Sequence, residues 1–225
     1  MRDPQSFDHL AARYDRLAEM LGAELTAWLM FHLPARGDRA VDLGCGTGVH
    51  TGLLAGRCGE VLGVDLSVPM LEHARRRRPH PAVRWERRDL RDVTPREDGL
   101  FDVVFSAYTL HHVPEPDTAL HRMRSLVRPG GRVLLVDLVD GRGSPPRDWL
   151  RAEAWRTFRG DLRRRRFAEA VELLRLQLDP DWLDHQSTDR LRSAEDWDKH
   201  ARAVFPGASI VPLHRAHALA WTAGP

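Results

Sequence analysis

The distribution of apolar and polar residues predicts alternating short strands and helices through the first two thirds of the chain. Segments with the length and character of strands are 40–43, 61–66, 83–85, 101–106 and 133–138. Helical spacing is found between them, at 48–57, 67–78 and 116–127. Strands separated by helices favour right-handed crossovers and a parallel sheet covered on both faces. We therefore expect an α/β, doubly wound architecture.

The two ends of the chain and one internal segment depart from this alternation. Residues 7–31 have helical spacing interrupted near Gly22, which predicts two helices. Residues 140–190 contain no convincing strand and predict two inserted amphipathic helices. We expect a single domain over 1–225, with an N-terminal helical cap (1–36) and a helical lid (140–190) that covers the active site.

A hairpin is expected at the C-terminus, after a helix that begins at Ser193 and ends at Phe205. The strand candidates 209–213 and 217–222 are separated by three residues, too few for a helical crossover, so they should pair antiparallel. Pro212 cannot donate a ladder hydrogen bond, which places the first of these strands at the sheet edge.

Composition narrows the class of protein without identifying it. The 225 residues are 42% hydrophobic and 29% charged, with a net charge of +2, which gives weak support for a nucleic-acid partner. No apolar run has the length of a membrane span and no signal peptide is recognisable, so we expect a cytoplasmic protein without membrane contact. Cys45 and Cys58 fit neither a disulfide framework nor a zinc pattern, and no metal site is predicted. The runs 75–78 and 163–166 are interpreted as solvated arginine faces.

A glycine loop and three acidic residues indicate the cofactor site. Gly44, Gly46 and Gly48 follow the first strand, where doubly wound sheets bind their ligands and where glycine lets the backbone approach. Asp65 ends the second strand, where a carboxylate can bind both hydroxyls of a ribose. Asp89 follows the third strand, and Asp42 precedes the loop. Acids at successive strand ends suit a cationic cofactor without phosphates.

With these motifs the sequence resembles the class I, Rossmann-like S-adenosylmethionine-dependent methyltransferases of small molecules. The segments that carry the resemblance are 41–48, 63–67, 89–90, 101–104 and 126–131. It implies a seven-stranded, mostly parallel sheet in the order 3-2-1-4-5-7-6 with the seventh strand antiparallel, which agrees with the predicted hairpin. It also implies S-adenosyl-L-methionine as cofactor and S-adenosyl-L-homocysteine as product.

Position by position, the resemblance implies roles for individual residues. The loop would lie under the methionine portion, Asp65 would hold the ribose, and Asp89 would bind the adenine amino group. Leu66 and Met70 would flank the adenine, and Ser106 would line the floor near the sulfonium. Phe7-Asp8 and Arg13-Tyr14-Asp15 resemble a cap whose tyrosine closes over the cofactor, although the spacing of Tyr14 also fits a packing residue. The cofactor-binding residues expected in this way are Tyr14, Asp42, Gly44, Cys45, Gly46, Gly48, Asp65, Leu66, Met70, Asp89, Leu90, Ser106 and His111.

The acceptor side is indicated by His111 and His112, which follow the fourth strand. A histidine has a suitable pKa to act as base toward a phenol, enol or hydroxyl, while a packing or loop-binding role is the alternative. The ubiquinone and menaquinone methyltransferases, which the chain broadly resembles, have an Arg-Asn-like pair here, and this difference argues against a quinone precursor. Further residues considered near the pocket are Asp137, His185, Arg156, Trp149, Trp155 and Trp182.

Three other functions remain open. An RNA or protein methyltransferase is the main alternative to a small-molecule enzyme, although no Asn-Pro-Pro-Tyr type motif and no separate RNA-binding domain is recognisable. A non-catalytic adenosylmethionine-binding protein is also compatible, because the motifs concern binding rather than chemistry. A nicotinamide dehydrogenase is the third. The acceptor, the atom methylated and the choice between monomer and homodimer are not determined by the sequence.

Overall fold

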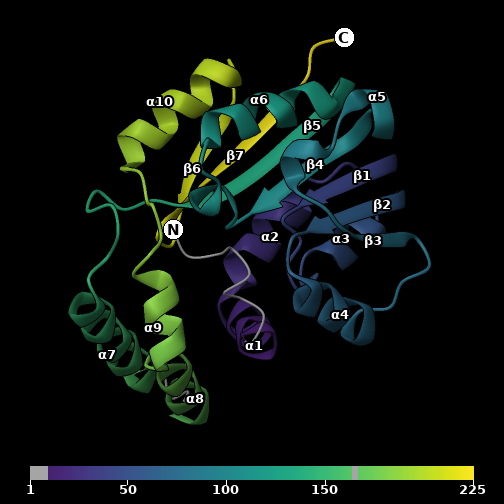
Figure 1. The fold of residues 1–225 in the computed structure, drawn as a ribbon. Helices are drawn as coiled ribbons and strands as arrows, with labels where there is room; N and C mark the ends of the chain where they lie inside the picture. Colours follow the sequence, from purple (N-terminus) through teal and green to yellow (C-terminus); the bar gives the residue numbers. More distant parts are fainter. Residues whose placement is uncertain (1–9, 164–166) are drawn as a thin grey trace.

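A seven-stranded sheet forms the centre of the protein, as seen in the computed structural model, which describes residues 10–163 and 167–225 (Figure 1). The strands are β1 (Gly37–Leu43), β2 (Cys58–Asp65), β3 (Val83–Arg87), β4 (Phe101–Ala107), β5 (Val127–Leu138), β6 (Ser209–Leu213) and β7 (Ala216–Thr222). They are ordered β3-β2-β1-β4-β5-β7-β6, with β1 to β5 parallel and β7 antiparallel to both of its neighbours. This confirms the predicted architecture and strand order.

The C-terminal hairpin forms as the sequence predicts. β6 lies at the sheet edge and carries Pro212, while β7 pairs with β5 along its whole length. The two strands are joined by His214 and Arg215, one residue fewer than expected, because β7 begins at Ala216. Arg215 adopts a left-handed backbone conformation, with φ of 53°, which allows so short a connection.

Helices cover both faces of the sheet. The helices are α1 (Ala11–Leu21), α2 (Ala23–His32), α3 (Thr51–Ala55), α4 (Val68–Arg77), α5 (Pro95–Asp98), α6 (Pro116–Leu126), α7 (Arg147–Arg163), α8 (Phe167–Gln177), α9 (Pro180–Gln186) and α10 (Ala194–Val204). α6 and α10 pack on one face, and α2 and α3 lie on the other (Figure 1). Within the described residues, no helix is both long enough and apolar enough to cross a membrane.

Alternation along the strands divides the core between the two faces. Val41 and Leu43 of β1 belong to the cluster that includes α6 and α10, whereas Ala40 belongs to the cluster that includes α2. Because both faces are covered, successive residues of β1 and β4 are buried. The central strands therefore read as continuous apolar runs, which is why the sequence located them well.

Two local expectations were wrong. The helix predicted over 48–57 is shortened to α3, because Gly48 adopts a left-handed conformation and Gly52 and Gly56 favour helix weakly. The described part of the insertion contains three helices rather than two. The additional helix, α9, is short, but Asp179 caps it and Pro180 occupies its first turn.

The insertion leaves the sheet and returns to nearly the same point. Val139 and Arg192 form an isolated parallel bridge, and the Asp140 N–H donates to the Arg192 carbonyl at 2.8 Å. α7, α8 and α9 pack on one another beyond the sheet, beside α1 (Figure 1). Arg16 of α1 makes a bidentate ion pair with Glu172 of α8, at 2.6 and 2.8 Å. The insertion and the N-terminal cap are thus in direct contact.

Candidate active site

The glycine loop occupies the turn between β1 and α3, at the carboxyl end of the parallel strands. All three of its glycines have left-handed φ angles: 76° at Gly44, 52° at Gly46 and 77° at Gly48. Residues with a Cβ rarely adopt this conformation. The Gly44 and Cys45 N–H groups both donate to the Val64 carbonyl at 2.9 Å, which fixes the loop to the end of β2.

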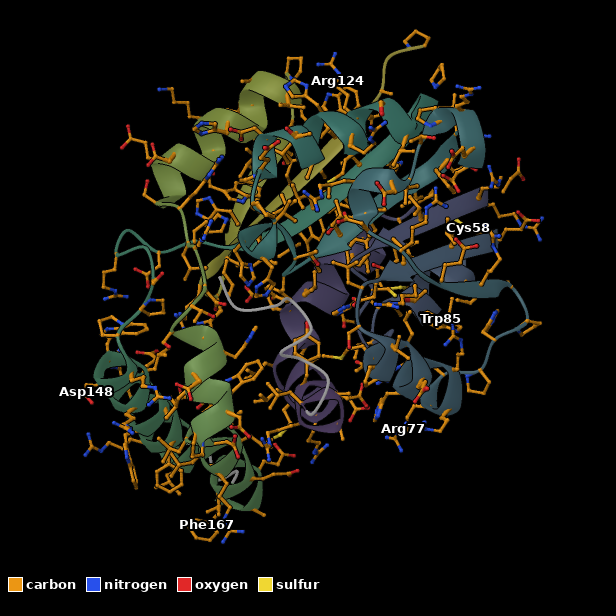
Figure 2. All side chains as sticks on the ribbon, viewed as in Figure 1. Cys58, Arg77, Trp85, Arg124, Asp148 and Phe167 are labelled. Carbon is orange, nitrogen blue, oxygen red and sulfur yellow. The ribbon has the colours of Figure 1, made fainter. Side chains whose placement is uncertain are left out.

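The three glycines serve different purposes. A Cβ on Gly44 would lie 2.3 Å from Thr109, and one on Gly48 would lie 2.4 Å from Trp85, a residue of β3 (Figure 2). These two glycines therefore make room for the protein's own side chains. Among the described residues, a Cβ on Gly46 would meet Tyr14 alone, at 3.6 Å. Gly46 is thus the loop glycine whose backbone is least crowded by the described part of the chain.

Asp65 organises the loop from the end of β2. One carboxylate oxygen accepts from the Gly46 N–H at 2.8 Å, and the other accepts from the Ser67 N–H at 2.9 Å. Ser67 in turn caps α4 by accepting from the Met70 N–H. Asp65 thus joins the glycine loop to the start of α4.

Asp42 lies below the loop and is almost fully buried. Its carboxylate accepts a hydrogen bond from the Thr51 hydroxyl at 2.6 Å. Burial raises the pKa of Asp42 to about 7; the Thr51 hydrogen bond opposes this rise and the charge of Asp65 adds to it. A cationic group bound nearby would restore the charged form. Asp42 can therefore respond to a ligand's positive charge.

Tyr14 is held over the loop by the residue that follows it. The buried Asp15 carboxylate accepts from Arg78 at 2.6 Å and lies 3.0 Å from His73 Nε2, both on or just beyond α4. Arg78 also pairs with Glu19 at 3.0 Å. The interpretation of Arg78 as part of a solvated face is therefore wrong, since its guanidinium joins the cap to α4. Phe7-Asp8 and residues 164–166 lie outside the described residues.

The remaining expected cofactor residues lie around β2 to β4. Met70 and Leu90 are buried, whereas Leu66 is exposed beside the loop. The Asp89 carboxylate accepts from Arg91 at 2.6 Å and from the Arg91 N–H at 2.8 Å. Ser106 is fully buried and donates to the Leu43 carbonyl at 2.6 Å, and Cys45 is a buried free thiol. Ser106 thus connects the ends of β1 and β4.

A cavity beside the loop contains two residues that the sequence did not single out. Its walls include Tyr14, Asp42, Gly44, His50 and Tyr108. Tyr108 follows β4 and has a φ of 55°, an uncommon conformation for a tyrosine. Burial lowers the pKa of His50 to about 4, so this histidine is neutral. Tyr108 could have been noticed from its place after a strand, but its backbone conformation has no sequence signal.

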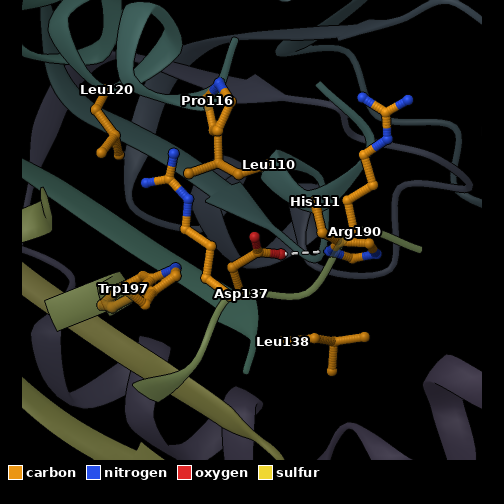
Figure 3. A pocket seen from close by; sticks show the side chains of 9 residues that line it. Leu110, His111, Pro116, Leu120, Asp137, Leu138, Arg190 and Trp197 are labelled. Atoms are coloured by element: carbon orange, nitrogen blue, oxygen red, sulfur yellow. Dashed lines mark hydrogen bonds and ion pairs between the residues drawn. The ribbon is translucent and has the colours of Figure 1, made fainter. Parts of the chain in front are cut away.

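His111 and His112 lie at the carboxyl end of β4, in the short 3-10 helix Leu110–His112. His111 Nδ1 lies 2.6 Å from a carboxylate oxygen of Asp137 on β5, and this pair borders a cavity toward α6 and α10 (Figure 3). Burial would lower the pKa of His111, but the Asp137 carboxylate outweighs it and raises that pKa. Bonding through Nδ1 leaves Nε2 to face other groups.

The insertion brings His185 and Asp189 to this pair. The rings of His111 and His112 are 4.0 Å apart between centroids, and His185 follows at 5.1 Å from His112. Asp189 Oδ1 lies 3.8 Å from His112 Nδ1 and 3.9 Å from His185 Nε2. Asp189 carries no recognisable sequence signal, because it follows α9 and approaches the site only through the fold.

Of the other candidate residues in the insertion, the structure places some near the histidines and others away from them. The Trp182 ring lies between Tyr14, at 6.2 Å, and His185, at 5.6 Å between centroids. Arg156 instead pairs with Glu153 of its own helix, and Trp155 is largely exposed. Trp149 packs against the guanidinium of Arg142 at 3.8 Å. Of the three tryptophans, Trp182 is the one that joins the cap to the histidine cluster.

Comparisons with known proteins agree with this arrangement. Residues 41–135 match the family described as methyltransferase domain. The chain is 37% identical over 142 residues to the cypemycin N-terminal methyltransferase of a Streptomyces species, covering 60% of this chain and 57% of that protein. It is 33% identical over 144 residues to the 2-phytyl-1,4-naphtoquinone methyltransferase of Synechococcus elongatus, covering 59% and 61%. The chain spans less than two thirds of the length of these relatives.

Solved structures share the fold over nearly the whole chain. A complex of DhpI with SAH superposes with a TM-score of 0.66 at 24% identity, covering 98% of this chain and 96% of that one. The phosphoethanolamine N-methyltransferase 2 of Haemonchus contortus, solved with S-adenosyl-L-methionine, superposes with a TM-score of 0.68 at 16% identity, covering 100% and 61%. At these identities the likeness concerns the fold.

Proposed function

We propose that this chain, which belongs to the class I S-adenosylmethionine-dependent methyltransferases, transfers a methyl group from S-adenosyl-L-methionine to a small organic acceptor. The observation that carries the proposal is the Asp65 carboxylate, which fixes Gly46 in its open, left-handed conformation at the end of β2. The glycine loop, whose backbone can approach a ligand, and an acid that can bind hydroxyls therefore meet at the carboxyl end of β2.

The residues present fit this cofactor. Gly46 leaves space below Tyr14, and Asp42 and Asp65 supply negative charge without a basic group in the loop. In our assignment Asp65 holds the ribose, Asp42 faces the cationic amine, and Asp89 accepts from the adenine amino group once Arg91 releases it. When bound, the cofactor supplies a methyl group activated by the positive sulfur, so the protein chiefly aligns the acceptor and excludes water.

Activation of the acceptor is assigned to the histidines. His111, oriented by Asp137, can take a proton from a hydroxyl or phenol through Nε2. His112 lies against it and is closer to the lid. The contact of Trp182 with Tyr14 supports a closed site in which residues 140–190 cover the acceptor and residues 1–36 cover the cofactor.

The substrate class rests on the lid as well as on the relatives. A site covered by α9 and α1 suits a small acceptor better than a nucleic acid or a folded protein. The cypemycin and naphthoquinone enzymes act on different acceptors by name, so a panel of phenols, quinone-like compounds and short peptides is appropriate. Whether oxygen, nitrogen or carbon is methylated would be read from the product.

The cofactor assignment is tested with Asp65→Ala. Calorimetry with S-adenosyl-L-homocysteine should show binding to the wild type and a loss of at least about a hundredfold in the variant, because the hydrogen bonds to Gly46 and Ser67 and the ribose contact disappear. Asp148→Asn, on the outer side of α7 (Figure 2), is the control. Unchanged affinity in Asp65→Ala would refute the ribose assignment.

A further inference from the structure

The cluster formed by His111, His112, His185 and Asp189 has properties that a proton-transfer role leaves unexplained. Asp189 is 96% buried, its side chain being only 4% exposed, and Oδ1 accepts no hydrogen bond from the described residues. Burying a carboxylate oxygen without a partner is unfavourable. The atoms that face Asp189 Oδ1 are imidazole nitrogens.

The distances match a shared cation better than hydrogen bonds. Asp189 Oδ1 lies 3.8 Å from His112 Nδ1 and 3.9 Å from His185 Nε2, beyond hydrogen-bond range. An ion equidistant from three or four donor atoms spaced like these would lie about 2.2–2.4 Å from each, so a small movement of the side chains would give the usual transition-metal distances to nitrogen and oxygen ligands. One donor atom each from His111, His112 and Asp189 also lie within 4.8 Å of one another.

Asp137 adds the support that a histidine ligand normally has. Metal-bound histidines usually donate their second ring nitrogen to a carboxylate, which fixes the ring and its tautomer. His111 Nδ1 is bonded to Asp137 at 2.6 Å, so Nε2 is the nitrogen available for an ion.

We propose that His111, His112 and Asp189 form a binding site for a divalent transition-metal ion, with His185 within reach as a fourth ligand. Two or three imidazoles with one carboxylate suit Zn²⁺, Fe²⁺, Mn²⁺ or Co²⁺ and not Mg²⁺ or Ca²⁺, which prefer oxygen ligands. The ligands come from the 3-10 helix Leu110–His112 and from the end of the lid. Metal binding would therefore also hold the lid against the sheet.

The role of the ion rests on the proposed methyl transfer. An acceptor hydroxyl bound to the ion loses its proton to solvent more readily, because the positive charge stabilises the oxyanion. The oxygen then uses its electron pair to form the bond to the methyl carbon, while the pair of the broken carbon–sulfur bond stays on sulfur. In metal-free protein, His111 remains the base described above.

The test uses the full chain treated with a chelator and titrated with Co²⁺, followed by its absorption spectrum, and with Zn²⁺ by calorimetry. We expect one ion per chain. Asp189→Asn and His112→Gln should each weaken binding by at least about a hundredfold, and Asp137→Asn by about 10- to 100-fold. The controls Asp148→Asn and His121→Gln should bind as the wild type does.

Absence of stoichiometric binding of both ions would overturn the proposal, and so would binding that survives both Asp189→Asn and His112→Gln. Circular dichroism checks the fold of each variant, and His185→Gln replaces any variant that does not fold. Calorimetry with S-adenosyl-L-homocysteine on the metal-free protein tests the cofactor site separately. Loss of metal binding with retained cofactor binding would reject this inference alone, whereas the reverse result would reject the proposed function alone.

Discussion

Replacing Asp15 by Asn should separate the N-terminal cap from the rest of the protein. The Asp15 carboxylate is 4% exposed and joins α1 to α4 through Arg78 and His73. The amide has almost the same shape but no charge, so the Arg78 guanidinium loses its buried counter-ion. Tyr14 is the neighbour of Asp15 on α1, and the substitution therefore acts on the cofactor site through the position of the helix.

The expected loss in the free energy of unfolding depends on the contacts that Arg78 keeps in Asp15→Asn. Removing one partner from a buried ion pair costs about 3–5 kcal/mol. Arg78 is 19% exposed and keeps Glu19 at 3.0 Å, so we expect a smaller loss of about 2–3 kcal/mol in the free energy of unfolding. For a chain of this size, that corresponds to a fall in Tm of roughly 5–10 °C.

The pH dependence of stability is a second test of the role of Asp15. Burial opposes ionisation of Asp15, but hydrogen bonds from His73 and Arg78 outweigh it and lower its pKa. A carboxylate with a lowered pKa stabilises the fold above its unfolded pKa and loses this contribution as the pH falls through the folded value. The difference between Asp15→Asn and wild type should therefore be full at pH 7 and shrink below about pH 4.

Thermal and urea unfolding measure the stability, and calorimetry with S-adenosyl-L-homocysteine measures binding. Apparent affinity should fall in proportion to the fraction of molecules whose cap is docked. Glu19→Gln, which removes only the half-exposed partner of Arg78, is the control and should cost at most about 1 kcal/mol. Equal stability of Asp15→Asn and Glu19→Gln at pH 7 would show that Asp15 does not hold the cap.

Three further outcomes are expected. Gly46→Ala and Gly130→Ala, both at left-handed positions, should lose similar stability, about 1 kcal/mol, but only Gly46→Ala should lose cofactor affinity. Equal cofactor affinities of the two variants would show that Gly46 does not contact the cofactor. Because the pKa of Asp42 is raised to about 7, the stability that its protonated form contributes is lost as the pH rises from about 4 to 7, while cofactor affinity should rise over pH 6–8. In calorimetry, Asp42→Asn should flatten this dependence of affinity on pH. A wild-type affinity that does not change with pH would contradict the role of Asp42. In chelator-treated protein, Asp137→Asn should reduce kcat about 100-fold or more and shift its pH profile to lower pH, leaving cofactor affinity unchanged; an unmoved profile would exclude His111 as the base.

The fold was largely accessible from the sequence because its signals are local. Continuous apolar runs marked the buried strands, although β5 begins at Val127, six residues before the run 133–138 that the sequence indicated. Pro212 placed β6 at the edge. The errors arose where the local signals are weak: α3 is a five-residue helix that contains Gly52 and ends before Gly56, and α9 is too short for its periodicity to be recognised.

Within the candidate site, the sequence by itself determined the residues that follow the strands. Asp65 ends a strand, Gly44 directly follows one, and Gly46 and His111 lie within the next four residues of one, and parallel strands bring their carboxyl ends to one edge whatever the loops do. Chemistry tied to strand ends is therefore encoded in the local pattern of residues.

Only the tertiary structure decided which of these residues act together. Gly44 and Gly48 make room for Thr109 and Trp85, whereas no described residue crowds Gly46 in this way, a distinction that depends on side chains distant in sequence. Asp189 reaches the histidines because the lid returns beside Val139. Contacts between segments far apart in the chain depend on packing of the whole molecule, and no local pattern encodes them.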